Sequence, residues 1–312
     1  MSRIHDALKK AEQERVAVEP SVVEGPPLSP EATETTWSEL SPAITASDDT
    51  FAAPAVVAST IASESYLRFD QLMARCTHPH WQLDPNANVF TIGSNSRSAE
   101  QFRTLRSRLY QLRSNQPLRT ILITSAVPAE GKTFVASNLA QSIVRQPDRR
   151  VLLIDADLRS ARLHLPFGAP AAPGLTDYLR GEKDEAAVIQ SGNDSNLCLV
   201  PGGNEVTNPS ELLLNGRFST LLNRVGSVFD WVIVDSPPCL PVADSTILAD
   251  ACDAVLLVVR AGVTPSDIVQ RAVQDFQGRN IIGVVLNAVE DAHMYGSYYY
   301  SAEKYVSDSK PS

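Results

Sequence analysis

The sequence holds few of the residues that build disulfide-stapled or zinc-stabilised domains, with four cysteines among 312 residues. Cys76, Cys198, Cys239 and Cys252 are scattered, without a C-x-x-C pair and without histidine at a metal-ligand spacing. This pattern argues against a disulfide framework or a structural zinc site. It is typical of reduced thiols inside a cytosolic protein.

Long apolar runs and a basic surplus are also missing. No run approaches the roughly 18 residues that a membrane-spanning helix needs, and residues 1–15 lack the apolar region of a signal peptide. The 27 Lys and Arg residues are outnumbered by 36 Asp and Glu residues, which gives a net charge of −9. Such an acidic balance argues against general nucleic-acid binding. We therefore expect a soluble protein that contacts membranes only through a partner.

The N-terminal third reads as three segments. Residues 1–15 predict a short charged helix, which either stays solvated or docks on a partner. Residues 16–67 contain no Lys or Arg and are rich in acids, Pro, Ser, Thr and Ala, so we expect a disordered acidic linker. Residues 68–97 are ambiguous and are interpreted as an extended arm. Its apolar residues would pack on the following domain: Trp81, Leu83, Val89 and Phe90.

The sequence TILITSAVPAEGKT, residues 120–133, combines a buried strand with a glycine-containing loop. Gly131-Lys132-Thr133 then open a helical pattern that runs to about Gln146. Strand, loop and helix together predict a P-loop, in which main-chain N–H groups and the helix dipole hold phosphates. Lys132 would reach the β- and γ-phosphates and Thr133 would bind Mg²⁺. One position departs from the general pattern, because Ala126 stands where the first glycine is expected.

Two further apolar strands end in acids. VLLIDADLR carries Asp155 and Asp157, and DWVIVD ends at Asp235 as a Walker B strand does. Asp155 and Asp157 are two residues apart and point the same way if the strand conformation continues. Because ligand sites in open parallel sheets lie at the carboxyl ends of the strands, we expect all three acids near the P-loop.

Strand and helix patterns alternate from residue 120 to residue 287. This alternation predicts an α/β fold of the P-loop NTPase class, with a doubly wound, mostly parallel sheet in a domain of residues 98–288. Ser98 is expected to cap the first helix of that domain. We also expect one amphipathic helix over Pro209–Val225, opened by Asn208 and Pro209.

Two charged or aromatic features lie at the ends of this domain. Glu100, Arg103 and Arg106 are spaced by three on the first helix, which is compatible with an ordinary solvated face. Residues 289–312 lack a helix or strand pattern but carry five of the eight tyrosines. On a flexible end these rings have no core to enter, and the alternatives are a tail that folds back as a packing patch or a compositional accident. The tail tyrosines are Tyr295, Tyr298, Tyr299, Tyr300 and Tyr305.

These motifs together resemble the bacterial tyrosine autokinase family of capsule and exopolysaccharide biosynthesis, over roughly Ser98 to Tyr305. The resemblance rests on the ExxRxxR helix, AVPAEGKT, VLLIDADLR, WVIVDSPP and the terminal tyrosines. GLTDYLRGE and NPSELL, residues 174–182 and 208–213, also read like that family. The combination is specific although each motif alone is not.

The resemblance implies ATP with Mg²⁺ as phosphoryl donor and the tail tyrosines as acceptors. It implies that Asp155 accepts the tyrosine proton, that Asp157 and Asp235 organise Mg²⁺, and that Lys132 acts with them. Arg159 would help fix the phosphates and Asn287 would lie against the adenine. The nucleotide-binding set expected is Ala129, Glu130, Gly131, Lys132, Thr133, Phe134, Arg159 and Asn287. A free phenol has a pKa of about 10, so a nearby carboxylate is a chemically reasonable proton acceptor.

The resemblance also implies partners. ExxRxxR would form head-to-tail contacts in a homo-oligomeric ring, and autophosphorylation would occur between subunits. A separate transmembrane chain-length regulator would activate the kinase at the inner face of the plasma membrane, and a tyrosine phosphatase would reverse the modification. The role of residues 1–67 stays open.

Two other functions fit the same motifs. ATPases that position division sites and plasmids carry an additional lysine early in the P-loop, where this chain has Ala126-Val127-Pro128. A silent regulator would bind ATP and transfer nothing, although all the acids are present here.

Overall fold

The computed structural model describes residues 68–91, 96–192, 194 and 196–289. These residues all belong to the compact unit that spans Thr60–Ser312. The predicted N-terminal helix, the acidic linker and the five tail tyrosines lie outside the described residues.

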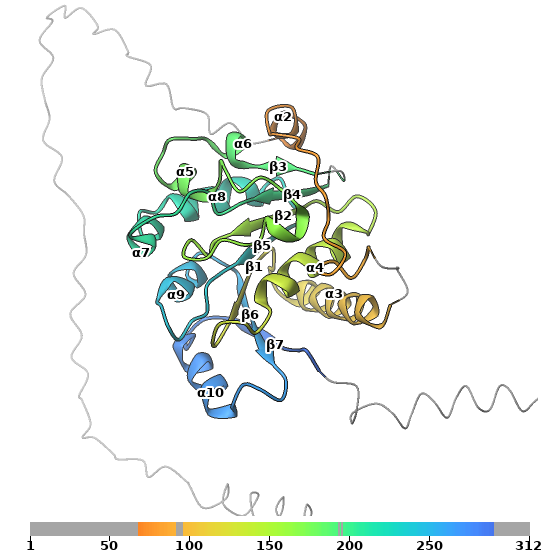
Figure 1. The fold of residues 1–312 in the computed structure, drawn as a ribbon, viewed down its shortest axis with the longest axis vertical. Helices are drawn as coiled ribbons and strands as arrows, with labels where there is room; N and C mark the ends of the chain where they lie inside the picture. Colours follow the sequence, from red (N-terminus) through yellow and green to blue (C-terminus); the bar gives the residue numbers. More distant parts are fainter. Residues whose placement is uncertain (1–67, 92–95, 193, 195, 290–312) are drawn as a thin grey trace, which may run out of the picture. The chain divides into compact units, whose positions relative to one another are not determined.

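A single seven-stranded sheet organises the described chain, in the order β3-β4-β2-β5-β1-β6-β7 (Figure 1). Its strands, in chain order, are Thr120–Ser125 (β1), Val151–Asp155 (β2), Gln190–Ser191 (β3), Leu197–Val200 (β4), Trp231–Asp235 (β5), Ala254–Arg260 (β6) and Ile281–Asn287 (β7). Every neighbouring pair is parallel except β3 with β4. The predicted mostly parallel sheet is therefore confirmed, and the two-residue edge strand β3 is the one that the sequence pattern did not reveal.

Helices cover both faces of the sheet (Figure 1). One face carries Arg97–Asn115 (α3) and Lys132–Val144 (α4). The other carries Leu175–Leu179 (α5), Glu185–Val188 (α6), Pro209–Leu213 (α7), Arg217–Gly226 (α8), Asp244–Ala249 (α9) and Ser266–Asp275 (α10). This two-sided cover is why the central strands β1, β2 and β5 read as continuous apolar runs, since both of their faces are buried.

The side chains of each central strand alternate between two separate cores. In β1, Leu122 enters the core under α8 and α9, whereas Ile121 and Ile123 enter the core under α3 and α4. The same period of two divides Leu152 from Leu153 in β2. A one-residue slip of either strand would exchange the two cores, so burial on both sides fixes the register that aligns the strand ends.

Two predicted helices begin or end elsewhere in the structure. The cap of α3 is Ser96, whose hydroxyl accepts a hydrogen bond from the Ala99 N–H at 3.2 Å, and not Ser98. The helix expected over Pro209–Val225 is divided into α7 and α8 by Gly216, which has a φ of 79°. A left-handed residue ends a right-handed helix, and glycine adopts that conformation without steric cost.

The predicted arm wraps around one edge of the sheet. It starts as the short helix Phe69–Met73 (α2), so the expectation of an extended segment over its full length was wrong there. Thr77 then pairs with β3, accepting a hydrogen bond from the Ser191 N–H at 2.8 Å. Leu72 packs in one core and Trp81 in the other, so the arm joins both faces while covering backbone groups at that edge.

We expect Trp81→Ala to lower the free energy of unfolding by about 3–5 kcal/mol, because the indole is 3% exposed and packs 5.2 Å from the Phe167 ring. Urea unfolding followed by circular dichroism would measure the change. Leu165→Ala is the matched control, since Leu165 is 57% exposed, and it should change stability by less than about 0.5 kcal/mol. An equal loss in both variants would show that the arm does not stabilise the domain.

Among the residues that the structure describes, no helix has the length and apolarity needed to cross a bilayer.

Candidate active site

The P-loop occupies the turn between β1 and α4, at the carboxyl edge of the sheet. Ala129 and Gly131 have positive φ angles of 65° and 92°. A Cβ on Gly131 would lie 2.0 Å from the Asn287 Nδ2 atom, and the positive φ also favours glycine there. Asn287 ends β7 and donates a hydrogen bond to the Glu130 carbonyl at 2.8 Å. The amide therefore braces the loop, and the predicted contact between Asn287 and the adenine stays a prediction.

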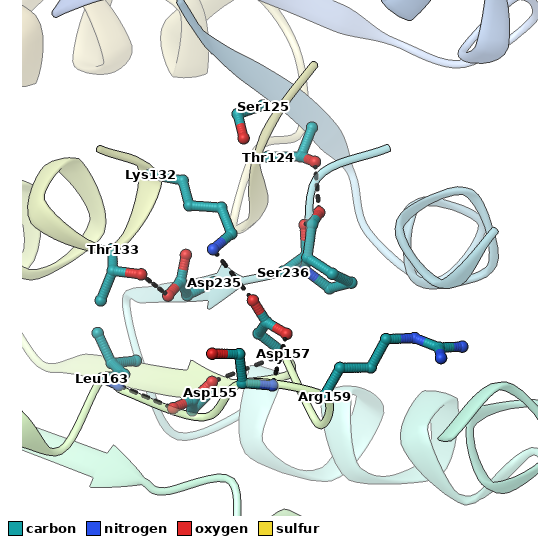
Figure 2. Close-up of polar contacts among 12 residues, drawn as sticks. Thr124, Ser125, Lys132, Thr133, Asp155, Asp157, Arg159, Leu163, Asp235 and Ser236 are labelled. Carbon is teal, nitrogen blue, oxygen red and sulfur yellow. Dashed lines mark hydrogen bonds and ion pairs between the residues drawn. The ribbon is translucent and has the colours of Figure 1, made fainter. Parts of the chain in front are cut away.

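Lys132 and Thr133 begin α4 and point toward carboxylates from neighbouring strands (Figure 2). The Lys132 Nζ atom lies 3.0 Å from the Asp157 Oδ2 atom. The Thr133 hydroxyl donates to the Asp235 Oδ2 atom at 2.6 Å. The structure thus brings together the lysine, the hydroxyl and two acids that the sequence placed on three separate segments.

The third acid, Asp155, lies beside Asp235 because the two are register partners on β2 and β5. Its carboxylate accepts hydrogen bonds from the Leu163 N–H at 2.8 Å and the Asp157 N–H at 3.2 Å. These main-chain donors fix the orientation of Asp155 at the carboxyl end of β2 (Figure 2). The loop between Asp157 and Leu163 folds back over its own strand to supply them.

Burial perturbs the protonation of Asp155 and Asp235. Burial raises the pKa of Asp155 well above its usual range, and the charges of Asp235 and Asp157 act in the same direction. Burial likewise raises the pKa of Asp235 to about 6, although Lys132 and Thr133 lower it. Clustered carboxylates with raised pKa values are a common property of sites that bind cations or move protons.

The same atoms fit a magnesium ion bound with phosphate. The Asp235 Oδ1 atom is buried and has no hydrogen-bond partner among the described residues, while its other oxygen contacts Thr133. Mg²⁺ prefers oxygen ligands and usually keeps waters and substrate phosphates in its shell. Among the described residues no group of three or more His, Cys, Asp and Glu side chains could hold a metal alone. Thr133, Asp235 and nucleotide oxygens would together supply oxygen ligands to a magnesium ion here.

Glu130 has a structural role that the sequence did not indicate. Its side chain is buried, accepting hydrogen bonds from the Val127 N–H at 2.9 Å and from the Thr264 hydroxyl at 2.6 Å. These contacts tie the P-loop to the segment that follows β6. Phe134 packs edge-on against Phe102 with ring centroids 5.9 Å apart, so its ring belongs to the core under α3. Because both side chains make structural contacts, Glu130 and Phe134 could contribute only their main-chain groups to phosphate binding.

Arg159 points away from Lys132 (Figure 2). Its guanidinium donates to both oxygens of Asp244, at 2.7 and 3.2 Å, and to the Ser210 hydroxyl at 3.0 Å. The predicted phosphate contact of Arg159 is absent from this arrangement and stays a prediction. Asp244, which is buried at the start of α9, was not among the residues predicted from local motifs. Ser210 lies in the NPSELL segment, and this contact gives the segment a structural use.

The ExxRxxR residues separate into two roles. Glu100 and Arg103 form an ion pair of 2.7 Å at the surface. Arg106 turns under the helix and donates to the Ser142 carbonyl near the end of α4. A spacing of three falls short of the 3.6-residue turn, so the third residue has rotated toward the neighbouring helix. Glu100 and Arg103 therefore share an exposed face of α3, as expected, whereas Arg106 does not lie on that face.

Comparisons with known proteins agree with this geometry. The model of the AAA domain family AAA_31 matches residues 118–274. The chain is 34% identical over 206 residues to the tyrosine-protein kinase CpsD of Streptococcus agalactiae, covering 65% of this chain and 89% of that protein. It is 35% identical over 214 residues to the tyrosine-protein kinase wzc of Salmonella typhimurium, covering 68% of this chain and 30% of that protein. This chain therefore spans less than a third of the length of wzc.

Among solved structures, the kinase domain of the Escherichia coli tyrosine kinase ETK is similar with a TM-score of 0.56 and 36% identity. The match covers 63% of this chain and 79% of that chain. The fold, the site geometry and these likenesses lead to one conclusion: the chain belongs to the bacterial tyrosine-kinase family of P-loop proteins.

Proposed function

We propose that this chain is a protein-tyrosine kinase that uses ATP and Mg²⁺ and phosphorylates the tail of a neighbouring copy. The observation that carries the proposal is the convergence of Lys132 and Thr133 on the three aspartates at the carboxyl edge of the sheet. Phosphoryl transfer needs charge neutralisation and positioning more than covalent chemistry, and this set of groups supplies both.

Each residue has a defined task in that reaction. Lys132, which pairs with Asp157 in the structure, would bind the β- and γ-phosphates. Thr133, Asp157 and Asp235 would hold the magnesium ion. When bound, the ion neutralises phosphate charge. The tyrosine oxygen bonds to the γ-phosphorus, the bond to the β–γ bridging oxygen of ATP breaks, and ADP leaves. Asp155 accepts the phenolic proton, and its raised pKa makes it a stronger base than an exposed aspartate.

The proposed acceptors are the tail tyrosines Tyr295, Tyr298, Tyr299, Tyr300 and Tyr305, which lie outside the described residues. A complementation experiment tests transfer between chains. One protein carries Lys132→Met and an intact tail, and the other carries an intact site and phenylalanine at all five positions. Neither should acquire tail phosphotyrosine alone, whereas the mixture with ATP and Mg²⁺ should, as mapped by mass spectrometry.

The same experiment separates the alternatives. Hydrolysis of ATP with an unmodified tail in the wild-type protein would favour a positioning ATPase. ATP binding with neither hydrolysis nor transfer would favour a silent regulator. Wild-type tail phosphorylation without complementation in the mixture would restrict the reaction to a single chain.

We further propose that the surface pair Glu100–Arg103 mediates a homo-oligomeric ring. Arg103→Ala should shift the protein toward monomer and lower tail phosphorylation, as measured by analytical ultracentrifugation and phosphotyrosine blots. Arg108→Ala is the matched control, because Arg108 is exposed on the same helix. Arg106→Ala is a poor choice, since Arg106 contacts α4. A monomeric Arg103→Ala protein with full tail phosphorylation would contradict the ring.

Phosphates on several tail tyrosines would repel each other across such a ring and break it apart. By family likeness, we propose that this cycle regulates polymerisation and export of an exopolysaccharide. The partners would be a separate transmembrane chain-length regulator, which brings the kinase to the inner face of the plasma membrane, and a tyrosine phosphatase.

A further inference from the structure

A cavity of about 330 Å³ lies beside the proposed base, on the side of β2 that faces β4. Its walls come from residues 158–162 and His164 after β2 and residues 202–205 after β4, together with Ala171. A Cβ on Gly202 would lie 3.7 Å from the Asp155 Cγ atom, so this wall adjoins the base directly. The volume is at the lower end of ligand pockets and suits one side chain better than a nucleotide.

One cationic side chain in this cavity has no assigned use. Arg162 directly precedes Leu163, whose N–H holds the Asp155 carboxylate. Its side chain is exposed, and no hydrogen bond or ion pair involves it among the described residues. Arg159 also lines the cavity but is committed to Asp244. Within the described lining, Arg162 is therefore the guanidinium available to an incoming anion.

Two other polar residues that line the cavity, His164 and Glu205, bear on which ligand it could bind. The His164 Nδ1 atom is buried and has no hydrogen-bond partner among the described residues. Glu205 is exposed at the rim and would oppose an anion. The cavity is therefore a mixed site in which Arg162 and Glu205 act in opposite directions.

The tail sequence places an anionic or phosphorylatable side chain two positions before two of its tyrosines. Side chains two apart in an extended peptide point the same way, about 6.5–7 Å from one another. Glu303 stands two residues before Tyr305, and Tyr298 stands two residues before Tyr300. Glu303 carries a negative charge without modification, whereas Tyr298 becomes anionic only after phosphorylation.

We propose that the cavity binds the side chain two residues before the acceptor tyrosine and that Arg162 selects an anionic group there, either glutamate or phosphotyrosine. The inference deepens the proposed kinase function and rests on it. It assigns an order to the tail: Tyr305 is favoured from the start through Glu303, and Tyr300 becomes favoured once Tyr298 carries phosphate. Charge-assisted pairing of a guanidinium with phosphate is the recognition involved.

Synthetic tail peptides test the inference with the full-length protein whose five tail tyrosines are phenylalanine. Two peptides span residues 294–302 with Tyr300 as the sole acceptor, and position 298 is phenylalanine in one and phosphotyrosine in the other. We expect kcat/KM to be about tenfold higher for the phosphorylated peptide, the size of one charge-assisted hydrogen bond. For a peptide spanning residues 301–309, in which Tyr305 is the acceptor, Glu303→Gln should lower kcat/KM several-fold.

Substitutions in the cavity should either weaken or strengthen the preference for the phosphorylated peptide. Arg162→Ala should bring the ratio between phosphorylated and unphosphorylated peptides close to one, and Glu205→Gln should raise it. Arg271→Ala, an exposed arginine on α10, should leave the ratio unchanged. Fluorescence anisotropy of labelled peptides with ADP present gives the same comparison without turnover.

A ratio near one in the parent protein, or a ratio that Arg162→Ala leaves intact, would overturn the inference. If no peptide is phosphorylated, the proposed function fails, and the anisotropy ratio then decides the binding preference separately.

Discussion

Lys132→Met should lower phosphotyrosine on the tail by at least about a hundredfold while the fold persists. The substitution removes the cation that lies 3.0 Å from Asp157 and that would neutralise the transferred phosphate. Loss of one charge-stabilising group in a preorganised site costs about 10²–10³ in rate. Quantitative mass spectrometry of the tail after incubation with ATP and Mg²⁺ measures the effect.

Two controls separate this chemical loss from misfolding. Lys183→Met removes an exposed lysine after α5 and should leave phosphorylation unchanged. Lys132→Arg keeps the positive charge beside Asp157 but presents a planar group of different shape, so the fold should be retained while activity falls. Tail phosphotyrosine within threefold of wild type in Lys132→Met would show that the P-loop does not hold the donor phosphates.

Asp235→Asn should stabilise the protein in EDTA at pH 8, although it removes a proposed magnesium ligand. The carboxyl is 1% exposed, and burial raises its pKa to about 6, so holding it ionised at pH 8 costs folding free energy. Neutral asparagine removes that cost while its oxygen still accepts from Thr133. We expect a gain of about 1–3 kcal/mol, or roughly 3–10 °C in Tm.

The pH dependence of that gain follows from the direction of the shift. Between the unfolded pKa of about 4 and the folded pKa of about 6, native Asp235 binds a proton that the unfolded chain does not. Wild-type stability from this group is therefore fully present below pH 4 and is lost as pH rises through 6. The difference between Asp235→Asn and wild type should be largest above pH 7 and shrink below pH 6.

Differential scanning calorimetry from pH 5 to pH 8 would record this trend. Asp267→Asn, a substitution of an exposed aspartate on α10, should change stability by less than about 0.5 kcal/mol at every pH. Addition of Mg²⁺ with ADP should stabilise wild type but not Asp235→Asn, because ligand binding stabilises only a native state that binds it. A destabilised Asp235→Asn protein at pH 8 would mean that the ionised carboxylate is well solvated or paired.

Most strands of the fold were predictable because they are continuous apolar runs bounded by polar residues, and β1, β2, β5, β6 and β7 lie where their patterns placed them. The residues of β1, β2 and β5 are buried on both faces, as are all but the last of β6, whereas the edge strand β7 keeps the apolar pattern although Val284 and Leu286 are exposed. Strand β3 was not predictable, since two residues, Gln190 and Ser191, form it by pairing with β4. The break between α7 and α8 was missed because the apolar spacing continues across it, and only the left-handed backbone at Gly216, the N-cap of α8, separates the two helices.

The phosphate loop, the three acids and the class of fold could be predicted from local motifs and strand periodicity, because these are properties of neighbouring residues. Which of these groups meet depends on how distant segments pack. Parallel register places Asp155 beside Asp235, while long-range packing turns Arg159 toward Asp244 and Arg106 toward α4. Those contacts join residues far apart in the chain, and their free energy depends on burial and distance that no local pattern contains.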